Sequence, residues 1–233
     1  MNCSTLKRER SDGGIFYSIS PLCFPNPFLD VHVLPTLVGP ESCERIIAAA
    51  EAADAWTKKS TLQTKKNDIS LSDLDLAEAE VAAVEALVGK IGAFVEAHFL
   101  SKWADLDGAT AKRGKYPPYS SVPRLKGTPF VIRYSAALNA TGLARHKDNS
   151  DVSFILLLSR PADFGGGGTA FDALPEPVHL QQGEALVFNG QLVHGSLPIT
   201  AGSRYVVSGF VNLAPEYLDM KRRATIATTV YHH

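Results

Sequence analysis

The sequence predicts an α+β protein that is mainly β, with two helices followed by a sandwich or barrel of short strands. Two observations carry this prediction. Before residue 100, apolar residues recur at every third or fourth position in two segments, which is the period of an amphipathic helix. From residue 129 onward, short apolar runs alternate with glycine and proline, which is typical of antiparallel strands joined by turns. With 233 residues, the chain is long enough to enclose one large core.

The first elements follow from local composition. Residues 1–30 are rich in proline, serine and charge, which predicts a loosely ordered arm. Residues 31–38 predict a first strand. Residues 40–56 predict a helix, because Pro40 suits an early turn and apolar residues follow at helical spacing. The polar residues 57–68 predict a loop or an exposed hairpin.

A second helix is predicted over residues 72–99, with Ser72 as its N-terminal cap. Residues 103–128 then lose all periodicity and contain three prolines and three glycines. A long irregular loop in a compact domain is often a lid over an active site, and residues 57–68 suggest a lid less strongly. Plain mobility is the alternative for both loops.

We therefore expect a helical support region with lid loops over residues 31–128, and a β core over residues 129–233. Together, residues 31–233 are expected to form one structural domain.

The charge and the cysteine content bear on the partners and the cellular location of the protein. The formal net charge is −1, so no global field attracts nucleic acid or an anionic membrane, and neither partner is expected. The three cysteines, an odd number, lack the spacing of a zinc knuckle or a redox pair, so free thiols in a reducing compartment are expected. The charged N-terminus is not followed by an apolar core, so no secretory signal is visible. These observations predict a cytoplasmic or nuclear protein; the sequence leaves its oligomeric state open.

A possible metal site begins at His146 and Asp148, which open an otherwise apolar run. Residues two apart on a strand point to the same side, so the two side chains converge. His194, beside a glycine at the end of a later strand, offers a third ligand. Two histidines and one carboxylate form the facial triad of non-haem Fe(II) oxygenases. The alternative is a chance tripeptide with a satisfied core histidine.

Arg204 favours the metal reading. It lies ten residues after His194 and opens the last long strand. An arginine that points into a barrel needs an anionic partner. The dicarboxylate 2-oxoglutarate fits, because its 2-oxo acid end can chelate iron while a guanidinium grips the far carboxylate. A surface carboxylate at the strand edge is the alternative partner.

Four motifs occur in order between Thr128 and Leu213: FVIRY, LxxHKD, FGGGGTAF and LVHGSLPITAGSRY. In this order they resemble the Fe(II)/2-oxoglutarate-dependent prolyl and lysyl hydroxylases, and the last motif looks most like the lysyl hydroxylase catalytic domain. The resemblance covers a little over a third of the chain. It implies a double-stranded β-helix (jelly-roll) of about eight strands, with the two helices packed on the outside of the larger sheet.

The resemblance also implies roles for individual residues. His146, Asp148 and His194 would bind Fe(II), and Arg204 would hold the C5 carboxylate of 2-oxoglutarate. Tyr134 matches a tyrosine that hydrogen-bonds the cosubstrate; its alternative is a half-buried strand tyrosine.

Three further positions are informative. Leu143 stands where prolyl hydroxylases often have a second tyrosine, and lysyl hydroxylases also have leucine there. Ser208 and Phe210 lie on the Arg204 side of the last strand, and are expected to line the pocket unless they are simple core.

The activity that the resemblance implies is hydroxylation of an unactivated C–H bond, with 2-oxoglutarate and O2 as cosubstrates and ascorbate as an optional further cofactor. Asp148 favours hydroxylation, because related halogenases carry a small residue there. Phe210 stands where nucleic-acid demethylases usually have a second arginine. The expected substrate is a prolyl or lysyl side chain in a protein, and a free amino acid or small metabolite is the alternative. In a different class, a non-catalytic jelly-roll that binds a metal or ligand would keep the same fold.

Overall fold

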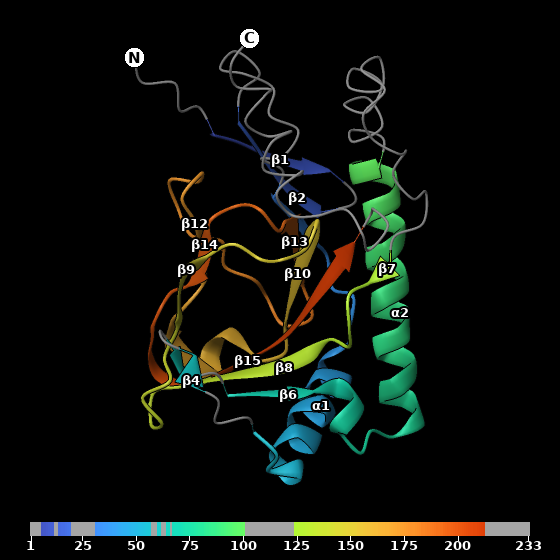
Figure 1. The fold of residues 1–233 in the computed structure, drawn as a ribbon, viewed down its shortest axis with the longest axis vertical. Helices are drawn as coiled ribbons and strands as arrows, with labels where there is room; N and C mark the ends of the chain where they lie inside the picture. Colours follow the sequence, from blue (N-terminus) through green and yellow to red (C-terminus); the bar gives the residue numbers. More distant parts are fainter. Residues whose placement is uncertain are drawn as a thin grey trace.

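The computed structural model describes residues 6–11, 14–19, 31–56, 60–61, 64–65, 67–100 and 124–212. These residues form two facing sheets, covered on one side by two helices, and a separate two-stranded hairpin (Figure 1). Every strand pairing among them is antiparallel. A parallel sheet alternating with helices is therefore excluded for the β core.

The larger sheet contains β1 (Leu6–Ser11), β2 (Gly14–Ile19), β3 (Val31–Leu34), β6 (Asp68–Ser70), β7 (Arg124–Leu125), β8 (Phe130–Ser135), β10 (Val152–Leu157), β11 (Phe164–Gly166), β13 (Ala185–Asn189) and β15 (Ile199–Asn212). Its order is β1-β2-β3-β13-β10-β15-β8-β6, and β7 and β11 also pair with β15. The smaller sheet has the order β12 (Thr169–Phe171), β14 (His194–Ser196) and β9 (Leu143–His146). This is the predicted double-stranded β-helix.

The helices are α1 (Pro40–Ala53) and α2 (Glu78–Val95), and α2 continues as a π-helical turn, η3 (Glu96–Leu100). The described ranges also contain two short 3-10 turns, η2 (Leu71–Asp73) and η4 (Pro161–Asp163). In Figure 1, α1 and α2 lie on one side of the larger sheet, and the strands β9, β12 and β14 lie on the other.

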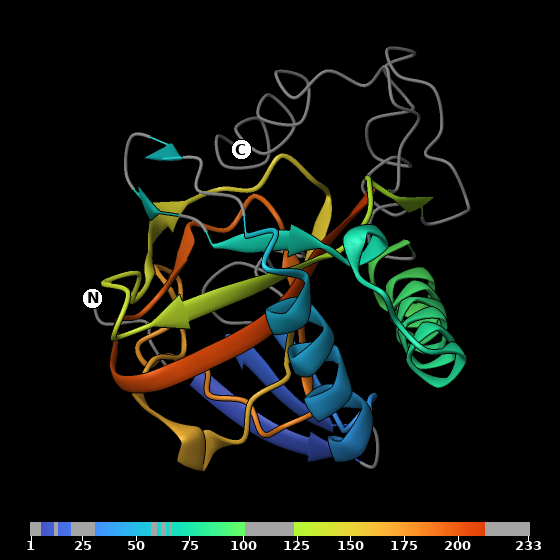
Figure 2. The ribbon, with the colours of Figure 1, turned by 90° about the horizontal axis from the view of Figure 1, so that it is seen from below.

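Two hydrophobic clusters fill the two faces of the larger sheet. The outer cluster joins the helices to the sheet, and α1 contributes Cys43, Ile46 and Ala50 at helical spacing. The strands contribute alternate residues, such as Phe154 and Leu156 of β10. The inner cluster lies between the two sheets and includes Tyr134, Phe171 and Phe188. The prediction that the helices pack on the larger sheet is confirmed, and Figure 2 shows α1 lying against it.

The expected loose arm is wrong for two parts of residues 1–30. Residues 6–11 and 14–19 form β1 and β2, which pair with each other, and β2 pairs with β3. Without them, β3 would be an edge strand with unpaired backbone groups. Pairing with β3 therefore explains why these residues form strands although their composition suggests disorder.

The Ser72 cap is also wrong. α2 starts six residues later, at Glu78, after Ala77, which makes no side-chain cap. The chain first forms η2, whose cap is Ser70. Leu71 and Leu74 are buried in the outer cluster, and their packing delays the start of the helix.

Both loop segments are described only in part. In residues 57–68, β4 (Ser60–Thr61) pairs with β5 (Thr64–Lys65), which agrees with a hairpin. The predicted lid at 103–128 lies outside the described residues up to position 123. None of the described helices combines the length and apolar character needed to cross a bilayer. The expected cytoplasmic or nuclear location and the division into regions stay predictions.

Candidate metal centre

The two candidate histidines lie opposite each other on paired strands. His146 ends β9, His194 begins β14, and these two residues are partners in the register of the pair. Their ring centroids are 4.5 Å apart. Asp148 follows two residues after β9, in a loop held by a hydrogen bond from its own backbone N–H to the carbonyl of Gly190, at 2.8 Å. Strand pairing therefore brings together residues almost fifty positions apart.

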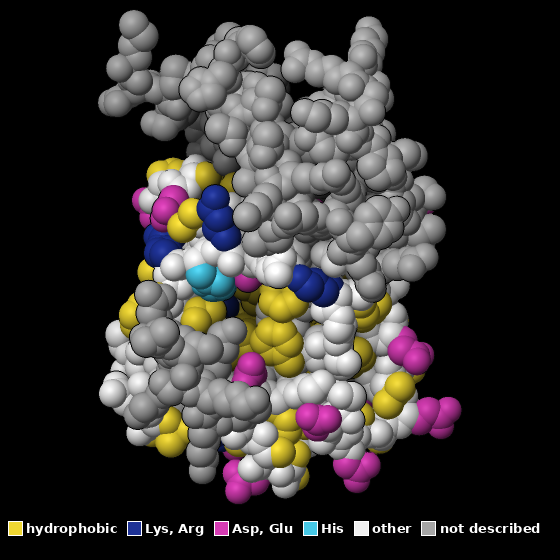
Figure 3. All heavy atoms as spheres, in the orientation of Figure 1, with side chains coloured by type: hydrophobic (Ala, Val, Ile, Leu, Met, Phe, Trp, Pro, Cys, Tyr) yellow, Lys and Arg dark blue, Asp and Glu magenta, His cyan; other side chains and the backbone are white. Residues whose placement is uncertain are grey.

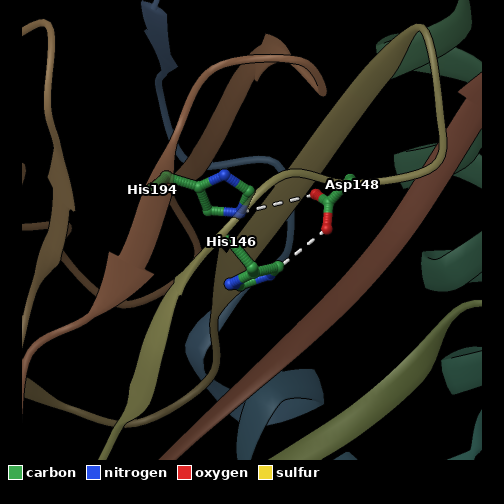
Figure 4. Close-up of side chains that lie close together, drawn as sticks. All are labelled: His146, Asp148 and His194. Atoms are coloured by element: carbon green, nitrogen blue, oxygen red, sulfur yellow. Dashed lines mark ion pairs between the residues drawn. The ribbon is translucent and has the colours of Figure 1, made fainter.

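The three side chains converge on one point. Each offers a ligand atom, and these atoms all lie within 4.8 Å of one another. Nε2 of His146 is 3.3 Å from Oδ1 of Asp148, and Nε2 of His194 is 3.4 Å from Oδ2. Figure 4 shows both rings directed at the carboxylate. This His-Asp-His cluster is suited to Fe(II), whose common protein ligands in oxygenases are two histidines and a carboxylate.

Hydrogen bonds orient both rings for metal binding. Nδ1 of His146 lies 2.8 Å from the carbonyl oxygen of Ala144, and Nδ1 of His194 lies 2.9 Å from that of Leu192. A carbonyl can only accept, so each Nδ1 carries the hydrogen. Each Nε2 then keeps its lone pair, directed toward the other ligands.

The electrostatics also suit a cation. Burial acts to raise the pKa of Asp148, but its interactions with His146, His194 and the Ser153 hydroxyl together bring that pKa below its usual value. Burial lowers the pKa of His194, and the attraction of Asp148 offsets only part of this effect. A carboxylate and a neutral imidazole are the protonation states that a metal requires.

Arg204 lies deeper in the same pocket and is 3% exposed. Its Nη1 donates to Oγ of Ser196 at 3.0 Å. No carboxylate among the described residues forms an ion pair with it. Burial lowers the pKa of Arg204, which reflects the cost of a charge without a counter-ion. An anionic ligand would remove that cost.

Tyr134 of β8 is the direct register partner of Arg204 on β15. The guanidinium carbon lies 5.4 Å from the centre of the tyrosine ring. Burial raises the pKa of Tyr134, and the charge of Arg204 and hydrogen bonding with Ser196 oppose that rise. The phenol therefore keeps its hydrogen at neutral pH and can donate it to an anion beside Arg204.

One pocket contains all five predicted site residues. It is lined by Phe130, Ile132, Tyr134, Leu143, His146, Asp148, Ile155, Thr169, Phe188, His194, Gly195, Ser196, Arg204, Val206, Ser208 and Phe210. The expected pocket positions of Ser208 and Phe210 are thus confirmed, and they follow from alternation along β15. Figure 3 shows a histidine at the rim of a hollow with hydrophobic side chains beneath it. The pocket has the His-Asp-His cluster at one end, Arg204 at the other and apolar walls between them. This arrangement suits a small dicarboxylate beside a substrate carbon.

Sequence reasoning missed two hydroxyls. Ser196 binds Arg204, and Ser153 binds Asp148. The signal for Ser196 is its position two residues after His194 on the same strand, which places both side chains on one face. The signal for Ser153 is a hydroxyl within an apolar run.

The chain is similar in part to curated PKHD-type hydroxylases. It is 30% identical to one from Prochlorococcus marinus over 88 residues, which cover 37% of each chain. It is 31% identical to one from Hyphomonas neptunium over 115 residues, or 44% of this chain and 50% of that protein. The chain thus spans half or less of the length of these relatives. No family model matches the chain. These relatives confirm the resemblance that the motifs predicted.

Solved structures share the fold at low sequence identity. A viral collagen prolyl hydroxylase from Paramecium Bursaria Chlorella virus-1 gives a TM-score of 0.55 at 14% identity, covering 79% of this chain and 90% of that one. A Pseudomonas putida prolyl-4-hydroxylase gives 0.51 at 16%, covering 79% and 93%. A Trichoplax adhaerens prolyl hydroxylase, in complex with a peptide fragment of hypoxia inducible factor, gives 0.51 at 14%, covering 84% and 86%.

Proposed function

We propose that this protein is an Fe(II)- and 2-oxoglutarate-dependent dioxygenase that hydroxylates an unactivated C–H bond. His146, Asp148 and His194 would hold the metal through two Nε2 atoms and one carboxylate oxygen. The bound iron, with O2 and 2-oxoglutarate, supplies the oxidising chemistry. The protein's own residues hold the cosubstrate, orient the substrate carbon and exclude water from the pocket.

The observation that carries this proposal is Arg204. A buried guanidinium with no carboxylate partner among the described residues lies in the pocket that contains the three ligands. A jelly-roll that binds only a metal has no need for such a charge. A dicarboxylate that spans the pocket explains both the three metal ligands and the buried guanidinium. One of its carboxylates would chelate the metal, and the other would accept two hydrogen bonds from Arg204. Tyr134 would add a third.

We propose a prolyl or lysyl side chain in a protein as the substrate. The apolar residues of the pocket, among them Phe130, Ile155 and Phe210, suit the aliphatic carbons of a prolyl ring or of a lysyl stem. Two structural neighbours support a peptide substrate: one is a viral collagen prolyl hydroxylase in complex with 2-oxoglutarate, and the other is a prolyl hydroxylase in complex with a peptide fragment of hypoxia inducible factor. PKHD-type hydroxylases among the relatives agree with hydroxylation.

Metal dependence tests the proposal. The purified chain, supplied with Fe(II), 2-oxoglutarate and a peptide library, should form succinate and add 16 Da to prolyl or lysyl peptides, as measured by mass spectrometry. His146→Ala should lower succinate formation at least about a hundredfold, because loss of outer hydrogen-bond partners alone costs 10–100-fold in such sites. Circular dichroism should show an unchanged fold.

His179→Ala is the matched control, because His179 is an exposed histidine outside the pocket lining. It should keep the wild-type rate. Succinate formation that survives complete removal of metal would exclude the proposed site. Succinate without any peptide product, across all peptides tried, would instead shift the substrate to a small molecule.

A further inference from the structure

Ser153 places a hydroxyl inside an apolar strand. It is the second residue of β10 and is 1% exposed. Its neighbours Val152 and Phe154 pack in the outer cluster, so Ser153 points to the inner side of the sheet. A buried hydroxyl is costly unless it is hydrogen-bonded. Its partners therefore explain why the residue is tolerated there.

The main partner is the candidate metal ligand. Oγ of Ser153 donates to Oδ2 of Asp148 at 2.6 Å, the length of a charge-assisted O–H···O⁻ bond. A carboxylate only accepts, so the single hydroxyl hydrogen of Ser153 is used by Asp148. Oγ of Ser150 lies 2.9 Å from Oγ of Ser153. Because Ser153 has no second hydrogen, Ser150 must be the donor of this bond. The two serines thus form a directed chain that ends on Oδ2.

The backbone around Asp148 is fixed from the other side. Nε2 of Gln191 donates to the carbonyl of Asp148 at 3.0 Å and to that of Ser150 at 3.2 Å. The N–H of Asp148 donates to the carbonyl of Gly190. With the main chain held, the remaining freedom is rotation of the carboxylate itself. The hydroxyl of Ser153 removes that freedom.

We propose that Ser153 is a positioning residue for the metal centre. By holding Oδ2 of Asp148, which also lies 3.4 Å from Nε2 of His194, it fixes the rotation of the carboxylate and with it the position of Oδ1, which lies 3.3 Å from Nε2 of His146. Ser150 strengthens this hold by donating to Ser153, since hydrogen bonds in a chain polarise one another. Ser153 touches neither metal nor substrate, and acts only through Asp148. The inference rests on the proposed function, which supplies the metal.

Metal affinity, rather than turnover, tests this role. Calorimetric titration of the metal-free protein with Mn²⁺, an air-stable stand-in for Fe(II), gives the Kd without cosubstrate or catalysis. Ser153→Ala should raise the Kd about 10–100-fold, the usual effect of losing an outer hydrogen bond to a metal ligand. Ser150→Ala should raise it by about two- to fivefold, because it weakens the chain by one neutral hydrogen bond. Ser153→Thr, which keeps the hydroxyl, should restore affinity.

Ser159→Ala is the matched control. Ser159 is also buried, at 2% exposed, and its Oγ accepts from the backbone N–H of Tyr205 rather than binding Asp148. It should lower the melting temperature but leave the Kd for Mn²⁺ unchanged. Equal losses of affinity in Ser159→Ala and Ser153→Ala would overturn the proposal, because they would show general destabilisation.

The outcomes separate the two proposals. If the wild type binds Mn²⁺ and Ser153→Ala binds it equally well, Ser153 has no positioning role, while the proposed function stands. If the wild type binds no Mn²⁺, the proposed function fails first. Should Ser153→Ala not fold, Ser150→Ala decides: a raised Kd with a wild-type fold supports the chain, and an unchanged Kd overturns it.

Discussion

Arg133 and Arg204 lie on adjacent strands and one step apart in register, but face opposite sides of the larger sheet. Arg133 on β8 pairs with Tyr205 on β15, and the next pair is Tyr134 with Arg204. Arg133 faces the helices. Its Nη1 donates to both carboxylate oxygens of Glu51, at 3.0 and 2.9 Å, and its guanidinium carbon lies 4.3 Å from the centre of the Trp56 ring.

Arg204 faces the pocket and has a different set of contacts. It meets the ring of Tyr134 and the hydroxyl of Ser196, with no carboxylate among the described residues. Both arginines thus have an aromatic neighbour, but within the part of the chain that the structure describes only Arg133 has a counter-ion. The difference indicates where a charge serves the fold and where it serves a ligand: the outer arginine is neutralised by Glu51, whereas the inner one has no carboxylate partner among residues 31–56, 67–100 and 124–212.

The largest difference should come from replacing each arginine by methionine. Arg204→Met keeps the apolar stem and removes both donors, so KM for 2-oxoglutarate should rise at least about tenfold, since each charged hydrogen bond contributes roughly 1.5–3 kcal/mol. Without cosubstrate, its melting temperature should not fall, because an unpaired buried charge is lost. Steady-state succinate assays and thermal unfolding measure these two effects. An unchanged KM would place the carboxylate anchor elsewhere.

Arg133→Met should show the opposite pattern. The ion pair with Glu51 is partly exposed, so losing it together with the contact to Trp56 should lower the free energy of unfolding by about 1–2 kcal/mol. KM for 2-oxoglutarate should stay at the wild-type value. Denaturant unfolding monitored by circular dichroism measures the first quantity. A raised KM with unchanged stability would contradict the division between the two faces.

Tyr134→Phe should give the smallest effect. It removes one neutral donor beside Arg204 and leaves the ring in place, so KM for 2-oxoglutarate should rise about two- to fivefold, corresponding to roughly 0.5–1 kcal/mol. The melting temperature should change little. The same assay as for Arg204→Met measures it, and Tyr205→Phe on the outer face is the control. A larger effect from Tyr205→Phe than from Tyr134→Phe on KM would reverse the assignment of faces.

The sequence predicted those features that depend on local spacing. His146 and Asp148, two apart on a strand, and Arg204, ten residues after His194, were identified from the printed chain, and the fold class came from periodicity and from the motif resemblance. The start of α2 was missed, because burial of Leu71 and Leu74 is a tertiary effect. The strands β1 and β2 were missed although Asp12-Gly13, a common hairpin dipeptide, separates them.

The hydrogen-bond network around the site could not have been predicted in the same way. Arg133 and Glu51 are 82 residues apart, and Gln191 reaches Asp148 across 43. Such contacts depend on the register of paired strands, which cannot be deduced from a single sequence. Side chains alternate between the two faces of a sheet along each strand. The face on which each arginine lies can therefore be predicted only when the register of its strand is known.

The register of β9 and β14 has a consequence for assembly of the protein. These strands are only four and three residues long, and they contribute His146 and His194 from opposed positions. A slip of one residue would turn one imidazole to the far face of the sheet. A cation that binds only the correctly paired form stabilises it by mass action. A metal that is present while the chain folds would therefore favour the correct register of β9 and β14.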